Sequence, residues 1–590
     1  MSLVRTHLCS HVSNKQLEQQ VIVNGWVNVR RDHGGVIFID LRDYSGTVQI
    51  VFDFENDKEN HKLAESLRNE FVIGVKGVVI KRTEININPK LVNGDIEVKA
   101  SQLVVYNSCD PLPFQINEDA ELSEKIRLEY RYLDLRRTNI TQNFLLRSKA
   151  NRIIRDFLSA DSFHEIETPV LTKSTPEGAR DYLVPSRVNP NKFYALPQSP
   201  QIFKQLLMIS GMDRYFQIVR CFRDEDLRGN RQPEFTQIDM ELSFTSPEEV
   251  MLICDRMMNL LFKETVGIKV ETPIEKISYQ DAIDFYGSDA PDMRYDLKLT
   301  DISEIFSNGS GLKVFDKAVE NGGVVKALLV PEGGEFSRKD LDDLTQLAMT
   351  YGAKGMAWVK INENGWQSPI EKFLSDEIKN KVQEKVGAGV GDLILFGADS
   401  KKIVSDSLGN VRKDVARRKN LIDDDVFKFV WVTDFPLFEK DAEDNLTSSH
   451  HPFTKPIQED LEKWSESNPT KIKAEAYDLV LNGVEIGGGS MRIHNPETQT
   501  EIFNLLGLSD DEIQEKFGFL IDAMRFGAPP HGGIAFGMDR IMMFLCKTNS
   551  IRDVIAFPKT QNAACLMTNA PSTVSSKQLR ELKISLIENT

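Results

Sequence analysis

The densest run of residues suited to chemistry lies between 214 and 244, RYFQIVRCFRDEDLRGNRQPEFTQIDMELSF. Two strand-like segments flank a charged loop that carries Arg223, which predicts an antiparallel hairpin. In the second segment Gln237, Asp239 and Glu241 alternate with apolar residues, so they share one face of the strand. A face in solvent fits this spacing about as well. The combination of a carboxamide and two carboxylates without lysine, close to an arginine, favours a preorganised anion site.

A second candidate site is AYDLVLNGVEIGGGSMRIHN, residues 476–495. Asp478 and Glu485 flank an Asn-Gly turn, and carboxylates on paired strands are suited to holding Mg²⁺ together with nucleotide phosphates. The alternative is a plain hairpin with surface acids. Three successive glycines, Gly487–Gly489, weigh against it, because they are costly in a strand unless a ligand or another backbone segment approaches closely.

The third candidate is FGAPPHGGIAFGMDRIMMFL, residues 526–545, where a glycine-rich strand runs into an apolar helix. Arg540 falls in the first turn of that helix, where the partial positive charge of the N-terminus favours phosphate. An arginine beside glycines is more often structural when it stands alone. The pair His450 and His451 would need further ligands to bind a metal. The sequence contains neither a P-loop nor a Rossmann glycine pattern, so any ATP would be bound in another way.

The chain that positions these residues has 590 residues, which predicts two to four domains. Its formal charge is -16, from 72 Lys and Arg against 88 Asp and Glu, so a nucleic-acid partner must be held by local patches rather than by the overall field. Hydrophobic residues make up 41%, and no apolar stretch reaches the length of a membrane span. We expect no membrane and no DNA partner.

The six cysteines are far apart and form no zinc-type cluster, so we expect a reducing, cytoplasmic location and no structural zinc. Residues 1 to about 106 hold five short alternating segments with a helix-like stretch at 61–70 between the third and the fourth. This order predicts an OB-fold barrel, whose open face commonly binds single-stranded nucleic acid. Helices are predicted at 337–352 and 375–387, in a mixed α/β insertion with few candidate catalytic residues.

Together the three stretches resemble the signature motifs of class II aminoacyl-tRNA synthetases. Motif one is similar to SFHEIETPVLT (162–172), although Ser162 replaces the usual glycine. Motif two is similar to CFRDE with RQPEFTQID, and motif three to GGIAFGMDR. TPEGARDYLV, LPQSPQIFKQLL and HHPFT resemble the aspartyl-tRNA synthetases in particular, and the inserted segment resembles the extra domain of their bacterial type. The resemblance covers nearly the whole chain.

The resemblance implies a role for each matching residue. ATP would be bound by Arg223, Asp224, Glu225, Gln232, Glu485, Gly537 and Arg540, with Arg223 and Arg540 as catalytic groups, and Mg²⁺ by Asp478 and Glu485. Aspartate would be bound by Glu177, Ser199, Gln201, Lys204, Arg223, Asp239, His450, His451 and Arg492. A buried guanidinium such as Arg492 suits a carboxylate, repels a lysine substrate and matches an amide poorly.

In the N-terminal barrel the resemblance implies an anticodon-binding face. Phe38 would stack on a base, while Arg31, Gln49 and Glu97 would read base edges. For Phe38 alone, a place in the core is the simpler interpretation. The resemblance also implies a hypothesis of relaxed tRNA choice, because some relatives with histidine at the position of His33 also charge tRNA(Asn). Pro169 lies at the position that the family uses in its dimer interface, which predicts a homodimer.

The resemblance therefore implies a multidomain α+β fold and an aspartate–tRNA ligase that uses ATP and Mg²⁺, with L-aspartate and tRNA(Asp) as partners. We expect an OB-fold anticodon-binding domain (1–108), a hinge (109–138), the catalytic antiparallel-sheet domain in two parts (139–290 with motifs one and two, 426–562 with motif three), an inserted domain (291–425) and a C-terminal extension (563–590). An asparaginyl- or lysyl-type relative and a non-catalytic RNA-binding paralogue are the alternatives.

Overall fold

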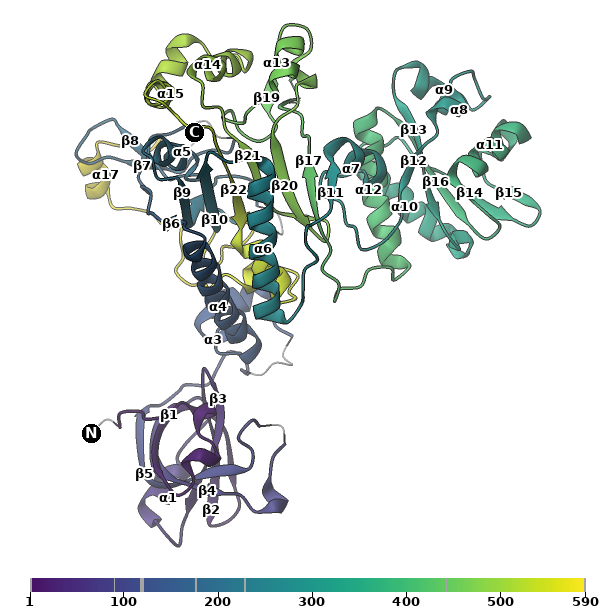
Figure 1. The fold of residues 1–590 in the computed structure, drawn as a ribbon. Coiled ribbons are helices and arrows are strands. Elements are labelled where there is room, and N and C mark those ends of the chain that lie inside the picture. The colour runs from purple at the N-terminus through teal and green to yellow at the C-terminus, as the bar shows by residue number, and fades with distance from the viewer. Residues whose placement is uncertain are drawn as a thin grey trace. The chain divides into compact units, whose positions relative to one another are not determined.

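The computed structural model describes residues 3–89, 91–116, 121–175, 178–227, 230–441 and 443–587. The chain divides into two compact units, Met1–Phe144 and Leu145–Thr590, and the division falls within the long helix α4 (Thr138–Ala160). Figure 1 labels the elements of both units. In the described ranges, every helix is too short or too polar to traverse a lipid bilayer.

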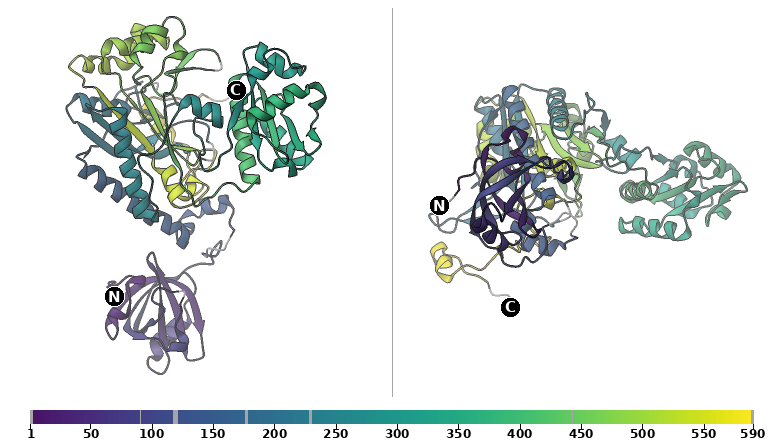
Figure 2. Two further views of the ribbon diagram at one scale, coloured as in Figure 1. Left: turned by 45° about the vertical axis from the view of Figure 1, so that its right-hand side comes forward. Right: turned by 90° about the horizontal axis from the view of Figure 1, so that it is seen from below.

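The first unit contains a closed barrel with the strand order β1-β2-β3-β5-β4, visible in the left view of Figure 2. Its strands are β1 (Gln20–Asp32), β2 (Val36–Asp43), β3 (Gly46–Asp53), β4 (Val72–Lys81) and β5 (Ile96–Asn107). Helix α1 (Lys58–Glu65) follows β3, and the Asp57 side chain caps it by accepting a hydrogen bond from Asn60 N. The predicted barrel order and its helix are confirmed, but the helix begins and ends earlier than the sequence indicated. Alternating apolar residues such as Val23, Ile39 and Ile50 are fully buried and fill the barrel.

After the barrel come two short helices, α2 (Glu124–Glu129) and α3 (Arg131–Asp134). The second unit is built on a sheet with the order β11-β17-β20-β21-β22-β10-β9-β6. Its strands are β6 (His164–Glu165), β9 (Arg214–Phe222), β10 (Glu234–Ser243), β11 (Lys276–Ser278), β17 (Phe429–Thr433), β20 (Ala476–Leu481), β21 (Val484–Met491) and β22 (His531–Gly537). The central pairs are antiparallel, as predicted, while the pairs β11–β17 and β6–β9 at the edges are parallel.

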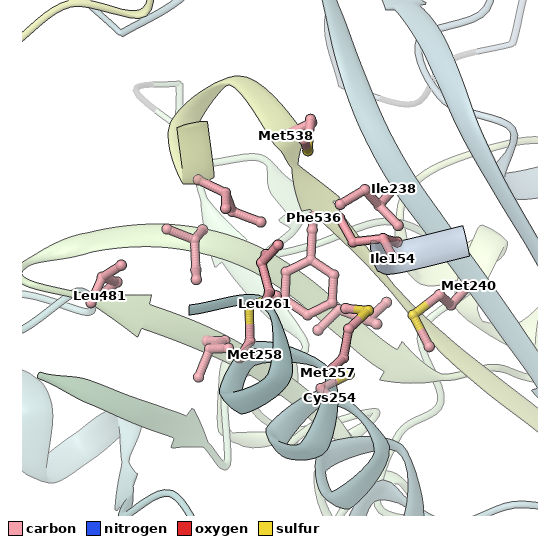
Figure 3. Packing of buried hydrophobic residues seen from close by; sticks show 14 of the residues in the cluster. Ile154, Ile238, Met240, Cys254, Met257, Met258, Leu261, Leu481, Phe536 and Met538 are labelled. Carbon is pink, nitrogen blue, oxygen red and sulfur yellow. The ribbon is translucent and has the colours of Figure 1, made fainter. Parts of the chain in front are cut away.

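Helix α6 (Pro247–Val266) covers one face of this sheet. Figure 3 shows how Met257 and Leu261 of α6 pack with Ile154 of α4, Met240 of β10 and Phe536 of β22, all of them buried. The apolar alternate residues of β10 and β22 therefore face a dry core, which leaves the opposite face of the same strands for polar residues. Helix α16 (Met538–Leu545) follows β22 directly, so the predicted strand-to-helix passage is confirmed.

The inserted segment contains a second sheet with the order β12-β13-β16-β14-β15. Its strands are β12 (Leu299–Asp301), β13 (Val324–Val330), β14 (Ala357–Asn362), β15 (Gly365–Gln367) and β16 (Leu393–Asp399), and its helices are α8 (Ser303–Phe306), α9 (Lys313–Glu320), α10 (Arg338–Thr350), α11 (Asp376–Val386) and α12 (Lys401–Arg418). The two helices predicted from sequence correspond to α10 and α11. Helix α7 (Tyr279–Tyr286) precedes the insertion.

Further elements of the second unit surround its main sheet. They are β7 (Leu183–Pro185), β8 (Phe193–Ala195), α5 (Gln201–Ile209), β18 (Phe438–Lys440), β19 (Leu446–Ser448), α13 (Gln458–Trp464), α14 (Pro496–Leu505), α15 (Asp510–Met524) and α17 (Ser576–Leu582). Ser162 adopts φ 65°, a conformation that favours glycine, so here the serine takes the turn itself at some conformational cost. Pro169 lies in an exposed loop next to Val170 and Leu171, which are 47% and 53% exposed.

Candidate functional site

A cavity of about 450 Å³ opens on the polar face of the main sheet. Residues far apart in the sequence meet there, because β10, β21 and β22 are neighbours and α5 and α16 flank them. The predicted site residues that line it are Ser199, Gln201, Lys204, Arg223, Glu225, Gln232, Asp239, His450, His451, Asp478, Glu485, Arg492, Gly537 and Arg540. The three candidate stretches 214–244, 476–495 and 526–545 therefore share one cavity.

The polar face of β10 is buried rather than solvated. Asp239 and Glu241 are both 0% exposed, which rules out the solvent-facing alternative for this strand. The physical reason is the position of β10 between β9 and β22 near the middle of the sheet, where one face meets the core and the other meets the cavity. Period two separates the two faces, but only the tertiary structure covers both of them.

Four buried charged residues form an ionic cluster at the inner end of the cavity. Lys204 Nζ lies 3.2 Å from Asp239 Oδ1 and 3.3 Å from Glu241 Oε2. Arg492 donates from Nε to Glu241 Oε1 at 2.9 Å and from Nη2 to Glu241 Oε2 at 3.2 Å. The guanidinium fork thus has Glu241 as its bidentate carboxylate partner. The sequence placed Glu241 on the same candidate face as Asp239, but Glu241 was given no binding role there.

This cluster perturbs the ionisation of its members. Burial raises the pKa of Asp239, although Lys204 opposes the shift. For Glu241, burial acts in the same direction, but Arg492 and then Lys204 outweigh it and lower the pKa. Burial, reinforced by Arg492, holds the pKa of His451 well below its usual value. A neutral His451 is consistent with its Nε2 accepting a hydrogen bond from Arg492 Nη1 at 2.7 Å.

Three polar atoms of the cavity are buried without a partner among the described residues, and one of them is Ser449 Oγ. Among the described residues, no hydrogen bond reaches Asp239 Oδ2, an acceptor, or Gln201 Nε2, a donor. An unsatisfied buried polar group costs about 1–3 kcal/mol, so native proteins seldom keep one without a use. A ligand that offers an ammonium to Asp239 and an oxygen to Gln201 would satisfy both atoms.

The outer part of the cavity carries two further arginines. Arg223 lies over the Phe235 ring at 5.2 Å, and Phe235 also lines the cavity, so a flat ring and a cation are adjacent there. Arg540, in the first turn of α16, donates to the backbone oxygen of Glu485 at 2.6 Å. Both guanidinium groups keep donors for an anion in the cavity, since each carries five N–H groups that can donate hydrogen bonds.

Gln232 is engaged by a segment near the C-terminal end of the unit. Its Nε2 donates to Lys559 O at 3.0 Å, and its Oε1 accepts from Lys559 N at 2.7 Å. The ammonium of Lys559 lies 2.7 Å from Glu234 Oε1. A side-chain amide can both donate to and accept from one backbone unit, and in this way Gln232 joins the loop between β9 and β10 to residue 559.

The two carboxylates predicted to hold Mg²⁺ lie at one wall of the cavity. Their hairpin is confirmed, with Asp478 opposite Gly488 in the register of β20 and β21. A Cβ on Gly488 would lie 2.8 Å from Asp478 Oδ1, so the missing side chain leaves room beside the carboxylates. Gly487 and Gly489 instead allow close contacts with Phe536 and with the backbone oxygen of Gly533. One glycine of the run therefore leaves space beside the carboxylates, and the other two allow close packing, in line with the close approach that three successive glycines in a strand predicted.

The electrostatics of this wall suit a divalent cation. Glu485 keeps 48% of its side chain exposed to the cavity, yet the surrounding walls and then the charge of Asp478 raise its pKa. His450 Nε2 lies 3.2 Å from Asp478 Oδ1; burial opposes its protonation, but Asp478 outweighs burial and raises the pKa of His450. No group of three or more His, Cys, Asp or Glu in the described part of the chain could hold a metal. The two carboxylates would thus need oxygens from a phosphate ligand or from water.

One predicted residue of the described ranges is not part of this cavity. Asp224 does not line it, and its backbone N–H donates to Arg180 O at 3.1 Å. Glu177 lies outside the described residues. Conversely, sequence reasoning missed Tyr279, Asp289, Phe435 and Glu439, which line the cavity from α7, β18 and nearby loops. They belong to no motif, and no spacing signal marked them.

The predicted residues of the barrel meet on one face, as a chain of contacts. Arg31 donates twice to Asp40, at 2.7 Å each, and once to Gln49 Oε1 at 3.2 Å. Gln49 Nε2 donates to Glu97 Oε2 at 2.8 Å. Phe38 is half-buried while its neighbours Ile37 and Ile39 are fully buried, so Phe38 is not a core residue.

His33 lies 5.6 Å from Phe38 between ring centroids, edge to face. Arg82, which sequence reasoning missed, lies 3.9 Å from Glu97. Burial raises the pKa of Glu97, although a hydrogen bond from Gln49 and the charge of Arg82 oppose the shift. The face therefore combines a ring accessible for stacking with fixed donors and acceptors, as recognition of unstacked bases requires.

Comparison with known proteins matches most of the chain to two families. Residues 21–106 match the family described as OB-fold nucleic acid binding domain, and residues 123–561 match the family described as tRNA synthetases class II (D, K and N). A curated relative from Desulfatibacillum aliphaticivorans, named Aspartate–tRNA(Asp/Asn) ligase, is 54% identical over 99% of this chain and 98% of its own length. A relative with the same name from Natranaerobius thermophilus is 52% identical over 98% of this chain and 99% of its own.

Solved structures support the same fold. Asparaginyl-tRNA synthetase from Pyrococcus horikoshii, complexed with asparaginyl-adenylate, superposes with a TM-score of 0.59 at 18% identity and covers 95% of this chain and 99% of its own. The asparaginyl-tRNA synthetase from Entamoeba histolytica gives 0.56 at 18% identity, covering 92% of this chain and 95% of its own. With a family match over residues 123–561 and relatives above 50% identity along the chain, this protein belongs to the class II tRNA synthetases (D, K and N).

Proposed function

We propose that this chain is an aspartate–tRNA ligase, which activates L-aspartate with ATP and transfers it to the 3′ end of tRNA(Asp). One observation carries the choice of amino acid: the buried, unpartnered Asp239 Oδ2 and Gln201 Nε2 lie in a cavity with Lys204 and Arg492. This set offers an acceptor for an ammonium and several donors for carboxylates. The names of the relatives, which specify aspartate, support the same choice.

Binding of aspartate uses the charge balance of the ionic cluster. Lys204 and Arg492 carry two positive charges against Asp239 and Glu241, so a substrate that brings two carboxylates and one ammonium adds one net negative charge. An asparagine substrate adds no net charge, and its side-chain amide would present N–H donors to Lys204 and Arg492, which are donors themselves. Ser199, Gln201, His450 and His451 line the remainder of the amino-acid site, and Glu177 is proposed from the resemblance alone.

ATP would occupy the outer part of the cavity, with its phosphates between Arg223 and Arg540 and its base against Phe235. Glu225, Gln232 and Gly537 line the same region, and Asp224 is proposed from the resemblance alone. Asp478 and Glu485 would hold Mg²⁺, which when bound neutralises phosphate charge and polarises the phosphoryl group. The space beside Gly488, next to the carboxylate of Asp478, supports this role.

The first reaction is attack of the aspartate α-carboxylate on the α-phosphorus of ATP, which forms aspartyl-adenylate and releases pyrophosphate. Negative charge spreads over phosphoryl oxygens in this step, so Arg223 and Arg540 supply stabilisation and alignment, worth several kcal/mol in comparable sites. In the second reaction the terminal ribose hydroxyl of tRNA attacks the adenylate carbonyl, which yields aspartyl-tRNA and AMP. No protein nucleophile is needed.

The barrel face of Arg31, His33, Phe38, Gln49 and Glu97 would bind the anticodon. We further propose that tRNA(Asn) is also charged, on the basis of His33 and of relatives named for both tRNAs. Charging assays with tRNA(Asp) and tRNA(Asn) transcripts test this. Absence of Asp-tRNA(Asn) would end the proposal for tRNA(Asn) and leave the ligase proposal intact.

We also propose a homodimer, supported by the exposed apolar loop at Pro169, and a cytoplasmic location, supported by the absence of paired cysteines among the six. We propose the following domains: 1–108 binds the anticodon, 109–138 is a hinge, 139–290 and 426–562 form the catalytic domain, 291–425 is the insertion and 563–590 is a C-terminal extension.

Pyrophosphate exchange with each of the twenty amino acids tests the central proposal. We expect aspartate alone to support exchange, and Arg492→Ala to abolish it while ATP still binds. Comparable exchange with asparagine or lysine would assign the chain to another branch of the family. No exchange with any amino acid, in a protein that binds tRNA, would favour a non-catalytic RNA-binding paralogue.

A further inference from the structure

A second cavity, of about 1020 Å³, lies beside the active-site cavity, among α7, α12, β18 and the residues that follow α13. Tyr279, Asp289 and Glu439 line both cavities. The two spaces therefore adjoin at these three residues, and an elongated ligand can extend from one into the other. The second cavity has no role in the chemistry described above.

The walls of the second cavity are held in place by buried cations. Lys326 of β13 is 0% exposed and donates to Asp284 Oδ1 of α7 at 2.8 Å, and Lys401 of α12 lies 2.9 Å from the same atom. Arg412 of α12 stacks on Tyr295 at 4.1 Å and donates to the Tyr295 backbone oxygen at 3.0 Å. Because these contacts join α12 to α7 and to the start of the insertion, the cavity is preformed rather than a loose gap.

The charge of the second cavity differs from that of the chain. Seven basic and six acidic residues line it, whereas the whole chain has 72 basic and 88 acidic residues. Asp292, one of the six, is already paired with Arg294 at 2.8 Å. Lys402, Lys413 and Lys473 are exposed, and none of their ammonium groups has a hydrogen bond or an ion pair within the described ranges. These three lysines are available to an anion.

The size and the lining indicate which anion fits. The volume is at the upper end of the range for small-ligand pockets, which admits a single strand but not a nucleic-acid duplex. Half-buried Tyr279 and Trp464 add aromatic surface to the lining that carries the lysines, and rings together with cations are typical of single-strand binding. In the proposed reaction, one single-stranded polyanion must deliver its end to the neighbouring cavity, namely the 3′ end of tRNA.

We propose that the second cavity binds the sugar-phosphate backbone of the single-stranded 3′ end of tRNA, with Lys402, Lys413 and Lys473 contacting phosphates and Tyr279 marking the passage to the active site. This inference rests on the proposed function. It gives the inserted segment, through α12, a part in holding tRNA during transfer and none in forming the adenylate.

The test is the triple variant Lys402→Met, Lys413→Met and Lys473→Met, which removes the charges and keeps the apolar stems. A control with the same charge change replaces Lys313, Lys339 and Lys385, exposed lysines of the insertion that line neither cavity. Pyrophosphate exchange needs no tRNA, so we expect it to stay within twofold in both. We expect kcat/KM for tRNA to fall at least tenfold in the first variant only.

The salt dependence of tRNA binding provides a second readout. Three lost contacts to single-strand phosphates reduce the slope of log K against log salt by about 2. From 50 to 200 mM salt the wild type should therefore lose roughly sixteenfold more affinity than the triple variant. A transcript that lacks its last three nucleotides should bind the wild type and the triple variant alike, because the proposed contact is already missing.

Other outcomes overturn the proposal. An equal loss in the control variant would show a general charge effect, and an unchanged kcat/KM for tRNA would show that the lysines do not contact it. Loss of exchange in the folded triple variant, repeated in the single variant Lys402→Met, would assign the cavity to pyrophosphate. Failure of exchange in the wild type itself would instead contradict the proposed function.

Discussion

Replacing Glu241 with Gln tests whether Arg492 is aimed by its buried carboxylate partner. In the wild type, Glu241 Oε2 lies 3.2 Å from Arg492 Nη2 and 3.3 Å from the ammonium of Lys204. Glutamine keeps an oxygen for Nε of Arg492 but replaces Oε2 with an amide NH₂ group, which faces both cations. Two charged contacts are therefore lost. At about 1.5–3 kcal/mol each, the total is about 3–6 kcal/mol, close to the 3–5 kcal/mol typical of breaking a buried ion pair.

Only the arginine contact orients the guanidinium, so about 1.5–3 kcal/mol should appear in kcat/KM for aspartate, a roughly 10- to 150-fold loss. The remainder should lower the free energy of unfolding. Pyrophosphate exchange at varied aspartate, below the melting temperature of the variant, measures the first effect, and the KM for ATP should hardly change.

Glu249→Gln is the matched control, because Glu249 pairs with Arg214 at 2.9 Å but is 42% exposed. A surface pair contributes about 0–1 kcal/mol, so kcat/KM for aspartate should fall less than about fivefold in this variant. A change below threefold in kcat/KM for aspartate in Glu241→Gln would refute the idea that Glu241 aims Arg492. Equal effects in the two variants would refute the argument from burial.

Three further predictions concern other parts of the second unit. Gly488→Ala places a Cβ 2.8 Å from Asp478 Oδ1, which costs about 1–3 kcal/mol through overpacking. The rate of pyrophosphate exchange should therefore fall about tenfold, and more Mg²⁺ should be needed. Gly389→Ala is the control and should be neutral, because the nearest neighbour of its Cβ would be 3.8 Å away. Gln232→Glu loses the donor to Lys559 O, so the KM for ATP should rise about tenfold while the KM for aspartate stays constant; an equal rise in both would contradict the role assigned to Gln232. At Asp284, burial opposes ionisation, but hydrogen bonds from Lys326 and Lys401 outweigh it and lower the pKa to about 2. The stability that comes from this depressed pKa is present above about pH 4 and is lost as the pH falls toward about 2. In urea unfolding, the free energy of unfolding of the wild type should therefore exceed that of Asp284→Asn at neutral pH and approach it near pH 2. A difference in free energy that stays constant with pH would contradict the prediction.

The sequence alone determined the local structure and the chemistry of the motifs. Period-two alternation predicted the barrel strands and the β9–β10 hairpin, and the glycine-rich strand followed by an apolar run predicted β22 and α16. These features are local, because they depend on side-chain alternation and on backbone conformations that a few neighbouring residues fix.

Only the tertiary structure decided which charges meet. The pairing of Glu241 with Arg492 spans 251 residues and that of Gln232 with Lys559 spans 327, so no spacing could reveal them. The same holds for the burial of Asp239, which depends on strands on both sides of β10, and for the second cavity, whose walls come from α12 of the insertion and from α7, β18 and the residues after α13. Alternation along a strand only places a carboxylate on one face. The free energy of that charge depends on burial and on long-range contacts, because both its desolvation cost and its attraction to a cation become large only when packed neighbours exclude water.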